Sequence, residues 1–224
     1  MIQKLLTIFF WYLYHPFAFM YDFISTIVSF GKWKNWTYSL LPYLKPPNIL
    51  EIGVGPGHLL IKMSKSGTKV FGVDESFQML NLTKNNLQSL KKSNLPLPFL
   101  PRCKAQNLPF PNGVFTSVIA SFPTSYILDS QTISEISRVL TNQGILAILF
   151  GIELKPVTIP EKILAKLYQF TKESVPDSNW QEIVTAFFLK AGFSAEWKLI
   201  PSPPALLYIL YCSRNHPSGD FDVK

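Results

Sequence analysis

The sequence predicts a doubly wound α/β fold: a mostly parallel sheet of seven strands with helices on both faces, preceded by an N-terminal helical cap. Three observations support this prediction. A short apolar strand at residues 49–52 runs into three glycines at every second position and then into a helix. A second strand at residues 69–73 ends in an acid, Asp74. Apolar runs at 117–122 and 145–150 then alternate with amphipathic helical segments, which is typical of a parallel sheet.

The glycine segment, Gly53, Gly55 and Gly57, indicates a ligand site. Glycine lacks a Cβ, so its backbone can take positive φ and approach a ligand closely. The helix that begins near Gly57 adds unpaired N–H groups and a positive dipole end. A dinucleotide fingerprint would require glycine where His58 stands. Glu51 would repel a pyrophosphate, whereas it could help to hold an ammonium group. The segment therefore favours an adenosine-bearing ligand with an amino group, against a plain strand-to-helix turn.

The acid at the end of the second strand fits the same ligand. Asp74 follows Gly57 by 17 residues. In doubly wound sheets an acid at this place hydrogen-bonds the ribose hydroxyls. Glu75 follows it, and Ser76 can cap a helix whose Phe77, Leu80, Leu87 and Leu90 share one face.

Length and composition narrow the classes of protein. The 224 residues suit one domain, and 47% hydrophobic residues with 14% aromatics exclude a disordered chain. Cys103 and Cys212 show neither metal spacing nor a disulfide framework, so we expect no metal and a reducing, cytoplasmic compartment. Residues 1–128 hold 12 Lys and Arg against 4 acids, whereas residues 129–224 hold 9 against 10. A basic half can meet nucleic acid or an anionic membrane. A solvated basic face explains it more simply, and nucleic acid is not the partner that we expect.

The N-terminal apolar run leaves two interpretations open. Residues 5–14 are too few to span a bilayer, which takes ~20 residues, and His15, Pro16 and Asp22 interrupt the run. No small-residue cleavage site follows, which argues against a signal peptide. Residues 5–30 can form an interfacial helix that gives peripheral membrane contact. Alternatively, they cap the protein's own pocket.

Several motifs between residues 20 and 150 together resemble one family. They are the lead-in Tyr-Asp … Ser-x-Gly … Trp within 21–36, Glu-x-Gly-x-Gly-x-Gly at 51–57, the Leu-Pro-Phe segment within 104–119, and Arg-Val-Leu-x-x-x-Gly at 138–144. This pattern is similar to the class I S-adenosylmethionine (SAM)-dependent methyltransferases. Within them it resembles the ubiquinone/menaquinone-type C-methyltransferases of the methyltransferase-11 group. The resemblance implies the Rossmann-like class I methyltransferase fold, SAM as cofactor, and lead-in helices that close over it, with Tyr21 near its methionine end.

The chain departs from the family pattern at two positions. The family often reads Gly-Asp-Ala-x-x-Leu-Pro-Phe and then Phe-Asp-x-Val, whereas this chain has Lys104 and Thr116 in place of the two acids. The first acid commonly helps to read the adenine amino group. Its loss leaves the Ala105 backbone and Gln106 as the implied adenine contacts.

Residues 91–101 indicate a loop with a short third strand at best. The fourth strand ends in Ser121 and Phe122, and Tyr126 follows a few residues later. At this carboxyl edge of the sheet the reacting ends of cofactor and acceptor meet. We therefore expect Ser121 at the cofactor and the two aromatic residues in the pocket wall. Glu135 and Arg138, three apart on a predicted helix, suit a structural ion pair.

The C-terminal third completes the fold. Residues 180–188 form an amphipathic helix, capped by Asp177 or Ser178 and ended by Gly192. Strands at 195–200 and 205–212 complete the seven, and the last is expected to run antiparallel. We divide the chain into a cap or lid (1–44), a SAM-binding core (45–212) and a loose tail (213–224).

The predicted function is methyl transfer from SAM to a small lipophilic acceptor, a quinone-like ring or a lipid. Transfer from a sulfonium needs mainly alignment and exclusion of water. His15 and Asp22 are the only nearby candidates for a base, and neither is convincing. Two alternatives remain: a nicotinamide-dependent oxidoreductase, disfavoured by Glu51 and His58, and a non-catalytic binding module at a membrane or partner surface.

Overall fold

The computed structural model describes residues 25–27, 29–155, 158 and 179–214. Tyr21, His15, Asp22, Asp177 and Ser178 lie outside these ranges, as do most of residues 5–30 and the end of the predicted tail. The positions expected for them stay predictions. Within the described part of the chain, no helix is long and apolar enough to cross a bilayer.

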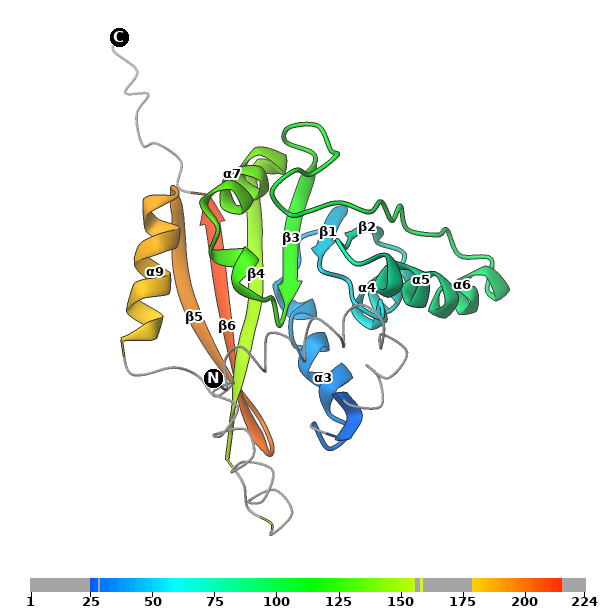
Figure 1. Ribbon diagram of the computed structural model, residues 1–224, viewed down its shortest axis with the longest axis horizontal. Helices are drawn as coiled ribbons and strands as arrows, with labels where there is room; N and C mark the ends of the chain where they lie inside the picture. The colour runs from blue at the N-terminus through cyan, green and yellow to red at the C-terminus, as the bar shows by residue number, and fades with distance from the viewer. Residues whose placement is uncertain (1–24, 28, 156–157, 159–178, 215–224) are drawn as a thin grey trace.

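The centre of the fold is one mixed sheet, with strand order β2-β1-β3-β4-β6-β5 (Figure 1). Its strands are β1 (Asn48–Ile52), β2 (Lys69–Val73), β3 (Phe115–Ser121), β4 (Leu140–Leu154), β5 (Phe193–Ser202) and β6 (Ala205–Arg214). The pairs β1–β2, β1–β3 and β3–β4 are parallel, whereas β6 runs antiparallel to both β4 and β5. The doubly wound arrangement and the antiparallel last strand are thus confirmed.

The sheet has six strands in the described residues, so the prediction of seven is not confirmed. The segment outside β2 makes only two single parallel bridges, Phe99 to Phe71 and Arg102 to Asp74. Three prolines lie between residues 95 and 102. Proline has no N–H to donate to a strand ladder. The expected third strand is therefore reduced to two isolated contacts.

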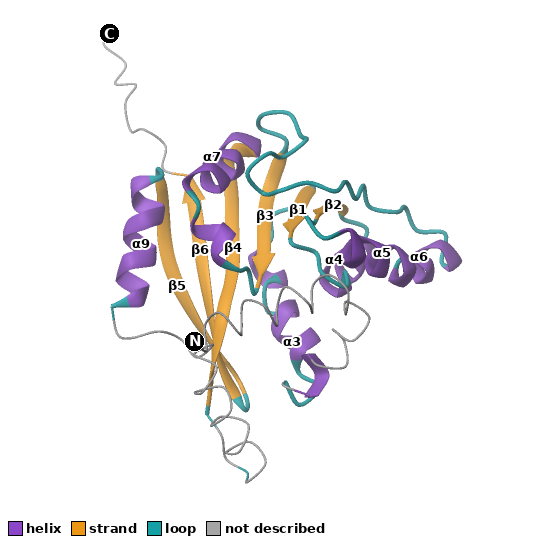
Figure 2. Ribbon diagram, viewed as in Figure 1, coloured by secondary structure: helices purple, strands orange, loops and turns teal. Residues whose placement is uncertain are grey.

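Helices cover both faces of the sheet (Figures 1 and 2). On one face, α3 (Trp33–Tyr38) and α4 (His58–Lys65) bury apolar side chains in a core with β1 and β4, and α5 (Phe77–Asn86) adds Leu80. On the other face, α7 (Ser130–Val139) and α9 (Trp180–Lys190) pack in a second core. The amphipathic pattern explains this placement, because the buried residues of α7 recur at Ile133, Ile136 and Val139. Three shorter helices, η2 (Leu41–Tyr43), α6 (Gln88–Lys92) and η3 (Ser125–Leu128), lie in connections.

Helix ends confirm some predictions and correct others. Ser76 caps α5 by accepting a hydrogen bond from the Met79 N–H. Phe77, however, is 53% exposed and does not share the buried face of this helix, because α5 turns Met79, Leu80 and Thr83 inward. Helix α9 begins after Asn179, the first described residue of this segment, and the chain turns away at Gly192 as expected, with φ of +84°.

The ion pair predicted on α7 is present and holds a loop. Arg138 Nε lies 2.6 Å from Glu135 Oε1. The Arg138 guanidinium also donates to the carbonyl oxygens of Leu108 and Phe110, and Glu135 Oε2 accepts from the Leu108 N–H. The pair therefore fixes the loop that leads into β3, which is a structural role.

Candidate functional site

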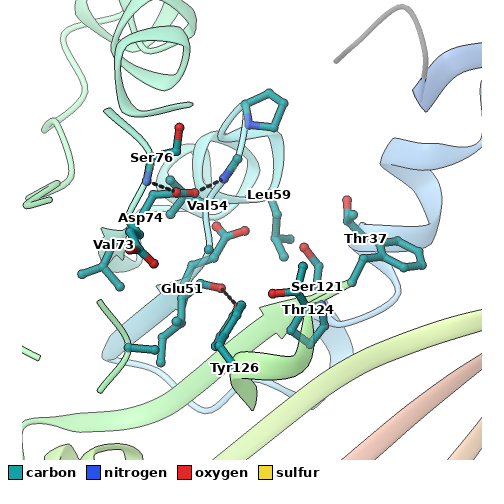
Figure 3. A pocket seen from close by; sticks show the side chains of 18 of the residues that line it. Thr37, Glu51, Val54, Leu59, Val73, Asp74, Ser76, Ser121, Thr124 and Tyr126 are labelled. Atoms are coloured by element: carbon teal, nitrogen blue, oxygen red, sulfur yellow. Dashed lines mark hydrogen bonds between the residues drawn. The ribbon is translucent and has the colours of Figure 1, made fainter. Parts of the chain in front are cut away.

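A cavity of about 380 Å³ lies at the carboxyl edge of β1, β2 and β3 (Figure 3). Eight of the ten predicted cofactor residues line it: Glu51, Gly53, Gly55, Asp74, Glu75, Ala105, Gln106 and Ser121. Gly57 is not among the lining residues, and Tyr21 lies outside the described part of the chain. Segments far apart in sequence thus meet at one site, as the topology of a doubly wound sheet requires.

The glycine segment folds as a tight loop between β1 and α4. Gly53, Gly55 and Gly57 all have positive φ, at +73°, +51° and +79°. A Cβ on Gly55 would meet no heavy atom within 4 Å, so that glycine faces open space in the cavity. A Cβ on Gly57 would lie 2.5 Å from Thr83, so this third glycine permits packing against α5 rather than approach to a ligand.

Helix α5 holds the loop from behind. The Thr83 hydroxyl donates to the Gly55 carbonyl oxygen, and Asn86 Nδ2 donates to the Pro56 carbonyl oxygen at 3.0 Å. These contacts fix the carbonyls of the loop. No sequence pattern predicted these contacts, because α5 and the loop are separate in the sequence and come together only when the chain folds.

Asp74 links the loop to the end of β2. Its Oδ2 accepts from the Gly55 N–H at 3.0 Å, and its Oδ1 accepts from the Ser76 N–H at 2.8 Å (Figure 3). A carboxylate oxygen can accept more than one hydrogen bond. The loop contact therefore leaves Asp74 chemically suited to accept from hydroxyl groups of a ligand as well.

Glu51 is a buried carboxyl group beside the cavity. Glu51 is 1% exposed, and its Oε2 has no hydrogen-bond partner among the described residues. Burial raises the pKa of Glu51 well above its usual range, and the negative charge of Asp74 raises it further; a hydrogen bond from the Leu60 backbone acts in the opposite direction. A buried acceptor without a partner is costly. A ligand ammonium group would provide the missing partner.

Residues from different segments lie on the two sides of the cavity. In Figure 3, Asp74, Val73 and Ser76 lie at one side, Thr37, Ser121 and Thr124 lie at the other, and Glu51 and Tyr126 lie between them. The Tyr126 hydroxyl donates to the Ile52 carbonyl oxygen at 3.3 Å and stands over Gly53.

The predicted adenine end carries an ion pair in place of the family's acid. Lys104 Nζ lies 3.4 Å from Glu75 Oε1. Gln106 Nε2 donates to Asp129 Oδ2 at 3.1 Å, so the start of α7 orients this amide. Burial, and then the charge of Asp74, raise the pKa of the Cys103 thiol to about 11, which keeps it protonated at neutral pH.

The second departure from the family pattern lies away from the site. Thr116 Oγ1 lies 2.5 Å from the Lys45 carbonyl oxygen, and it accepts from the Asn48 N–H at 3.2 Å. Thr116 therefore ties the turn before β1 to β3. The loss of an acid here does not remove a cavity group.

Part of the lining was not predicted from the sequence: Trp33, Thr37, His58, Leu59, Pro123 and Thr124. Trp33 stacks on Phe122, with ring centroids 4.2 Å apart and planes inclined by 22°. The feature of the sequence that could have indicated a role for Trp33 was its position within the lead-in segment. His58 had served only to exclude a dinucleotide fingerprint. Among the described residues, no group of three or more His, Cys, Asp or Glu could hold a metal ion.

Comparisons with known proteins agree with this geometry. Residues 49–144 match a family model described as a methyltransferase domain. The ubiquinone/menaquinone biosynthesis C-methyltransferase UbiE of Blochmanniella floridana is 30% identical over 205 residues, which cover 81% of this chain and 80% of that protein. The protein of the same name from Geotalea uraniireducens is 28% identical over 137 residues, covering 58% of this chain and 57% of that protein's length.

Solved structures share the fold. A SAM-dependent methyltransferase from Aquifex aeolicus aligns with a TM-score of 0.58 at 17% identity, over 83% of this chain and 93% of that one. Geranyl diphosphate C-methyltransferase from Streptomyces coelicolor aligns with a TM-score of 0.59 at 13% identity, over 81% and 79% of the two chains.

The site also fits the cofactor of these relatives. The partnerless oxygen of Glu51 suits the ammonium group of a bound amino acid, and the open side of Gly55 allows a ligand to approach the backbone. With the match to most of the B. floridana protein, these features identify the chain as a member of the class I SAM-dependent methyltransferases, the family whose methyl donor is S-adenosylmethionine.

Proposed function

We propose that this chain transfers the methyl group of SAM to a small lipophilic acceptor, a quinone-like ring or a lipid. The observation that carries the proposal is that two kinds of side chain line one cavity. The carboxyl groups of Glu51 and Asp74 belong to its lining, and so do the apolar side chains of Trp33, Leu59 and Phe122. Relatives named for ubiquinone and menaquinone biosynthesis support an acceptor of this class.

In this proposal nine of the ten predicted residues have a defined task toward the cofactor, whereas Gly57 packs against α5. Glu51 holds the ammonium group, and Asp74 accepts from the ribose hydroxyls. The backbone of Gly53 and Gly55 lies against the ligand. Around the adenine lie Glu75, Ala105 and Gln106; at the methionine end lie Ser121 and Tyr21.

Bound SAM supplies an activated methyl group on its sulfonium. The contribution of the protein is alignment of the acceptor for in-line attack and exclusion of water. The apolar rings and Leu59 exclude water from the acceptor side. Tyr126, fixed by its bond to the Ile52 carbonyl oxygen, covers Gly53 of the loop.

The acceptor class can be tested without knowing the acceptor. The protein is incubated with methyl-labelled SAM and cell extract, and label is measured in lipid, small-molecule and nucleic-acid fractions. We expect label in the lipid-extractable fraction, and none with a Gly55→Val variant. Label confined to nucleic acid, or SAM binding without transfer to any fraction, would contradict the proposal.

We also propose that residues 5–30 give peripheral contact with an anionic membrane, where lipophilic acceptors reside. Their apolar and aromatic composition suits an interface, and the flanking basic residues Lys4, Lys32 and Lys34 add an attraction that salt screens. The full chain should bind anionic vesicles and be partly released at high salt. Equal binding by a variant that lacks residues 1–16 would place the contact elsewhere and favour the pocket-cap interpretation.

The alternative functions gain no support from the comparisons. A nicotinamide-dependent oxidoreductase would bind a reduced nicotinamide dinucleotide and not SAM. A non-catalytic module would bind SAM yet methylate nothing in the extract. Titration with both ligands and the labelling experiment therefore separate all three.

A further inference from the structure

Phe122 stands in an unusual backbone conformation at the edge of the cavity. It directly follows β3 and has φ of +49°, in the left-handed region that bulky side chains rarely adopt. Its N–H donates to the Leu149 carbonyl oxygen at 2.8 Å, which fixes the backbone in this turn. Glycine would adopt this conformation without strain. Backbone strain of this kind is concentrated at functional sites.

The ring of Phe122 is held by a second ring from a distant segment. Trp33, near the start of α3, stacks on it at 4.2 Å with the planes inclined by 22°. Both residues line the cavity, and both are half-buried, so part of the stacked pair remains accessible. Trp36, three residues after Trp33 on α3, is fully buried in the hydrophobic core on this face of the sheet. This anchors α3 and so fixes the direction from which Trp33 approaches Phe122.

The stacked pair lies beside Ser121, which we propose at the methionine end of the cofactor, and thus next to the methyl group to be transferred. Phe122 is flanked by Ser121 and Pro123, and Leu59 and Thr37 complete this part of the lining. Figure 3 places Thr37, Ser121 and Thr124 on the side away from Asp74 and Ser76. No carboxylate belongs to these lining residues, so an uncharged acceptor suits this side.

We infer that Phe122, positioned by Trp33, is the platform on which a planar acceptor ring stacks, so that the site selects ring acceptors over acyl chains. This inference rests on the proposed methyl transfer and chooses between its two acceptor classes. Aromatic rings prefer offset-stacked or edge-to-face contacts with one another. A flat ring gains such a contact with Phe122, whereas a flexible chain gains only apolar burial that other side chains would also provide.

Binding measurements test the platform independently of turnover. With the protein saturated by S-adenosylhomocysteine, two probes are titrated: a short-prenyl 1,4-naphthoquinone and a short-chain phosphatidylethanolamine below its micelle concentration. We expect the wild type to prefer the quinone. Phe122→Gly, which keeps the backbone conformation and removes the ring, should weaken the quinone at least tenfold and leave S-adenosylhomocysteine within threefold.

Three further variants separate positioning from a general loss of structure. Phe122→Asn also tolerates positive φ and replaces the glycine variant if that protein melts early. Trp33→Leu should weaken the quinone, whereas Trp33→Phe should restore binding and lose part of the quinone's quenching of tryptophan fluorescence. Phe99→Ala removes a ring that is 57% exposed and outside the cavity lining, and should change neither ligand.

The possible failures are distinct. If the wild type binds S-adenosylhomocysteine but neither probe, the proposed lipophilic acceptor fails. If the quinone binds the wild type and Phe122→Gly equally well, the platform is wrong and the proposed function stands. If both probes bind the wild type equally well and lose affinity equally in Phe122→Gly, the proposed selection of rings over chains is wrong.

Discussion

Replacing Glu51 by glutamine should make the binding of SAM nearly independent of pH. In the structure the Glu51 carboxyl group is buried beside the cavity, and one oxygen has no partner among the described residues. Burial and the nearby charge of Asp74 raise its pKa, so the protein without cofactor holds this group protonated above pH 4.5, its ordinary value. A bound ammonium group favours the ionised form. Cofactor binding therefore removes a proton from Glu51.

The expected size follows from this linkage. A hydrogen bond between an ammonium and a carboxylate contributes about 1.5–3 kcal/mol. At a pH above the raised pKa the whole contribution appears in the affinity, and Glu51→Gln should weaken SAM by roughly 10- to 150-fold. At a pH below the raised pKa of Glu51, part of the free energy of this hydrogen bond is used to remove the proton from Glu51. The advantage of the wild type should then shrink by up to tenfold, about 1.4 kcal/mol, for each unit of pH.

The same shift predicts the stability of the free protein. Because the folded state binds a proton that the unfolded state releases above pH 4.5, the free energy of unfolding falls as pH rises from 4.5 to the raised pKa. The slope is at most about 1.4 kcal/mol per pH unit. Glu51→Gln should remove this slope. Thermal unfolding of both proteins across that range measures it.

Calorimetry in two buffers of different ionisation enthalpy provides the assay. Wild-type protein should release up to one proton when it binds SAM, and Glu51→Gln should release none. Equal proton release by the two proteins, or equal dependence of their affinities on pH, would refute the reasoning. In that case Glu51 neither titrates on binding nor faces the ammonium group.

Three further substitutions test other parts of the site. Asp74→Ala should weaken SAM at least tenfold in calorimetry, since two hydrogen bonds to a charged acceptor are worth ~1.5–3 kcal/mol each; unchanged affinity would remove Asp74 from the site. Arg138→Met should lower the free energy of unfolding by about 2 kcal/mol, because the bonds to Glu135 and the loop carbonyls are lost; an unchanged denaturation midpoint would contradict this. Thr116→Val should cost about 1 kcal/mol of stability and leave SAM affinity within twofold, since its contacts lie at the turn before β1; a large loss of affinity would place it in the site.

Local features of the sequence predicted the loop and the strand edge well. Glycine at every second position requires no information from distant residues, and all three adopt positive φ. Asp74 lies at the cavity because the connectivity of a doubly wound sheet brings the ends of β1 and β2 together. The sequence did not predict the second role of Asp74, whose Oδ2 accepts a hydrogen bond from the Gly55 N–H and so holds the loop.

Contacts between distant segments account for the misses. The stacking of Trp33 on Phe122 joins two segments that show no shared pattern. Thr116 was interpreted against the acid of the family pattern, yet its hydroxyl supports the turn at Lys45. The segment at 91–101, interpreted as a loop with a short third strand at best, contributes an isolated bridge and no strand, because its prolines lack the N–H groups that a ladder needs.

The most direct test of SAM binding at the glycine loop is one set of calorimetric titrations. A side chain at Gly55 would enter the cavity and adopt an unfavourable φ of +51°. Gly67 offers a matched control, because its φ is +79°, a Cβ there meets no atom within 4 Å, and it lies outside the cavity lining. SAM should bind the wild type and Gly67→Val with affinities within threefold of each other, and Gly55→Val should show no binding while it remains folded. SAM binding to Gly55→Val with wild-type affinity would contradict the account, as would a reduced nicotinamide dinucleotide that binds the wild type where SAM does not.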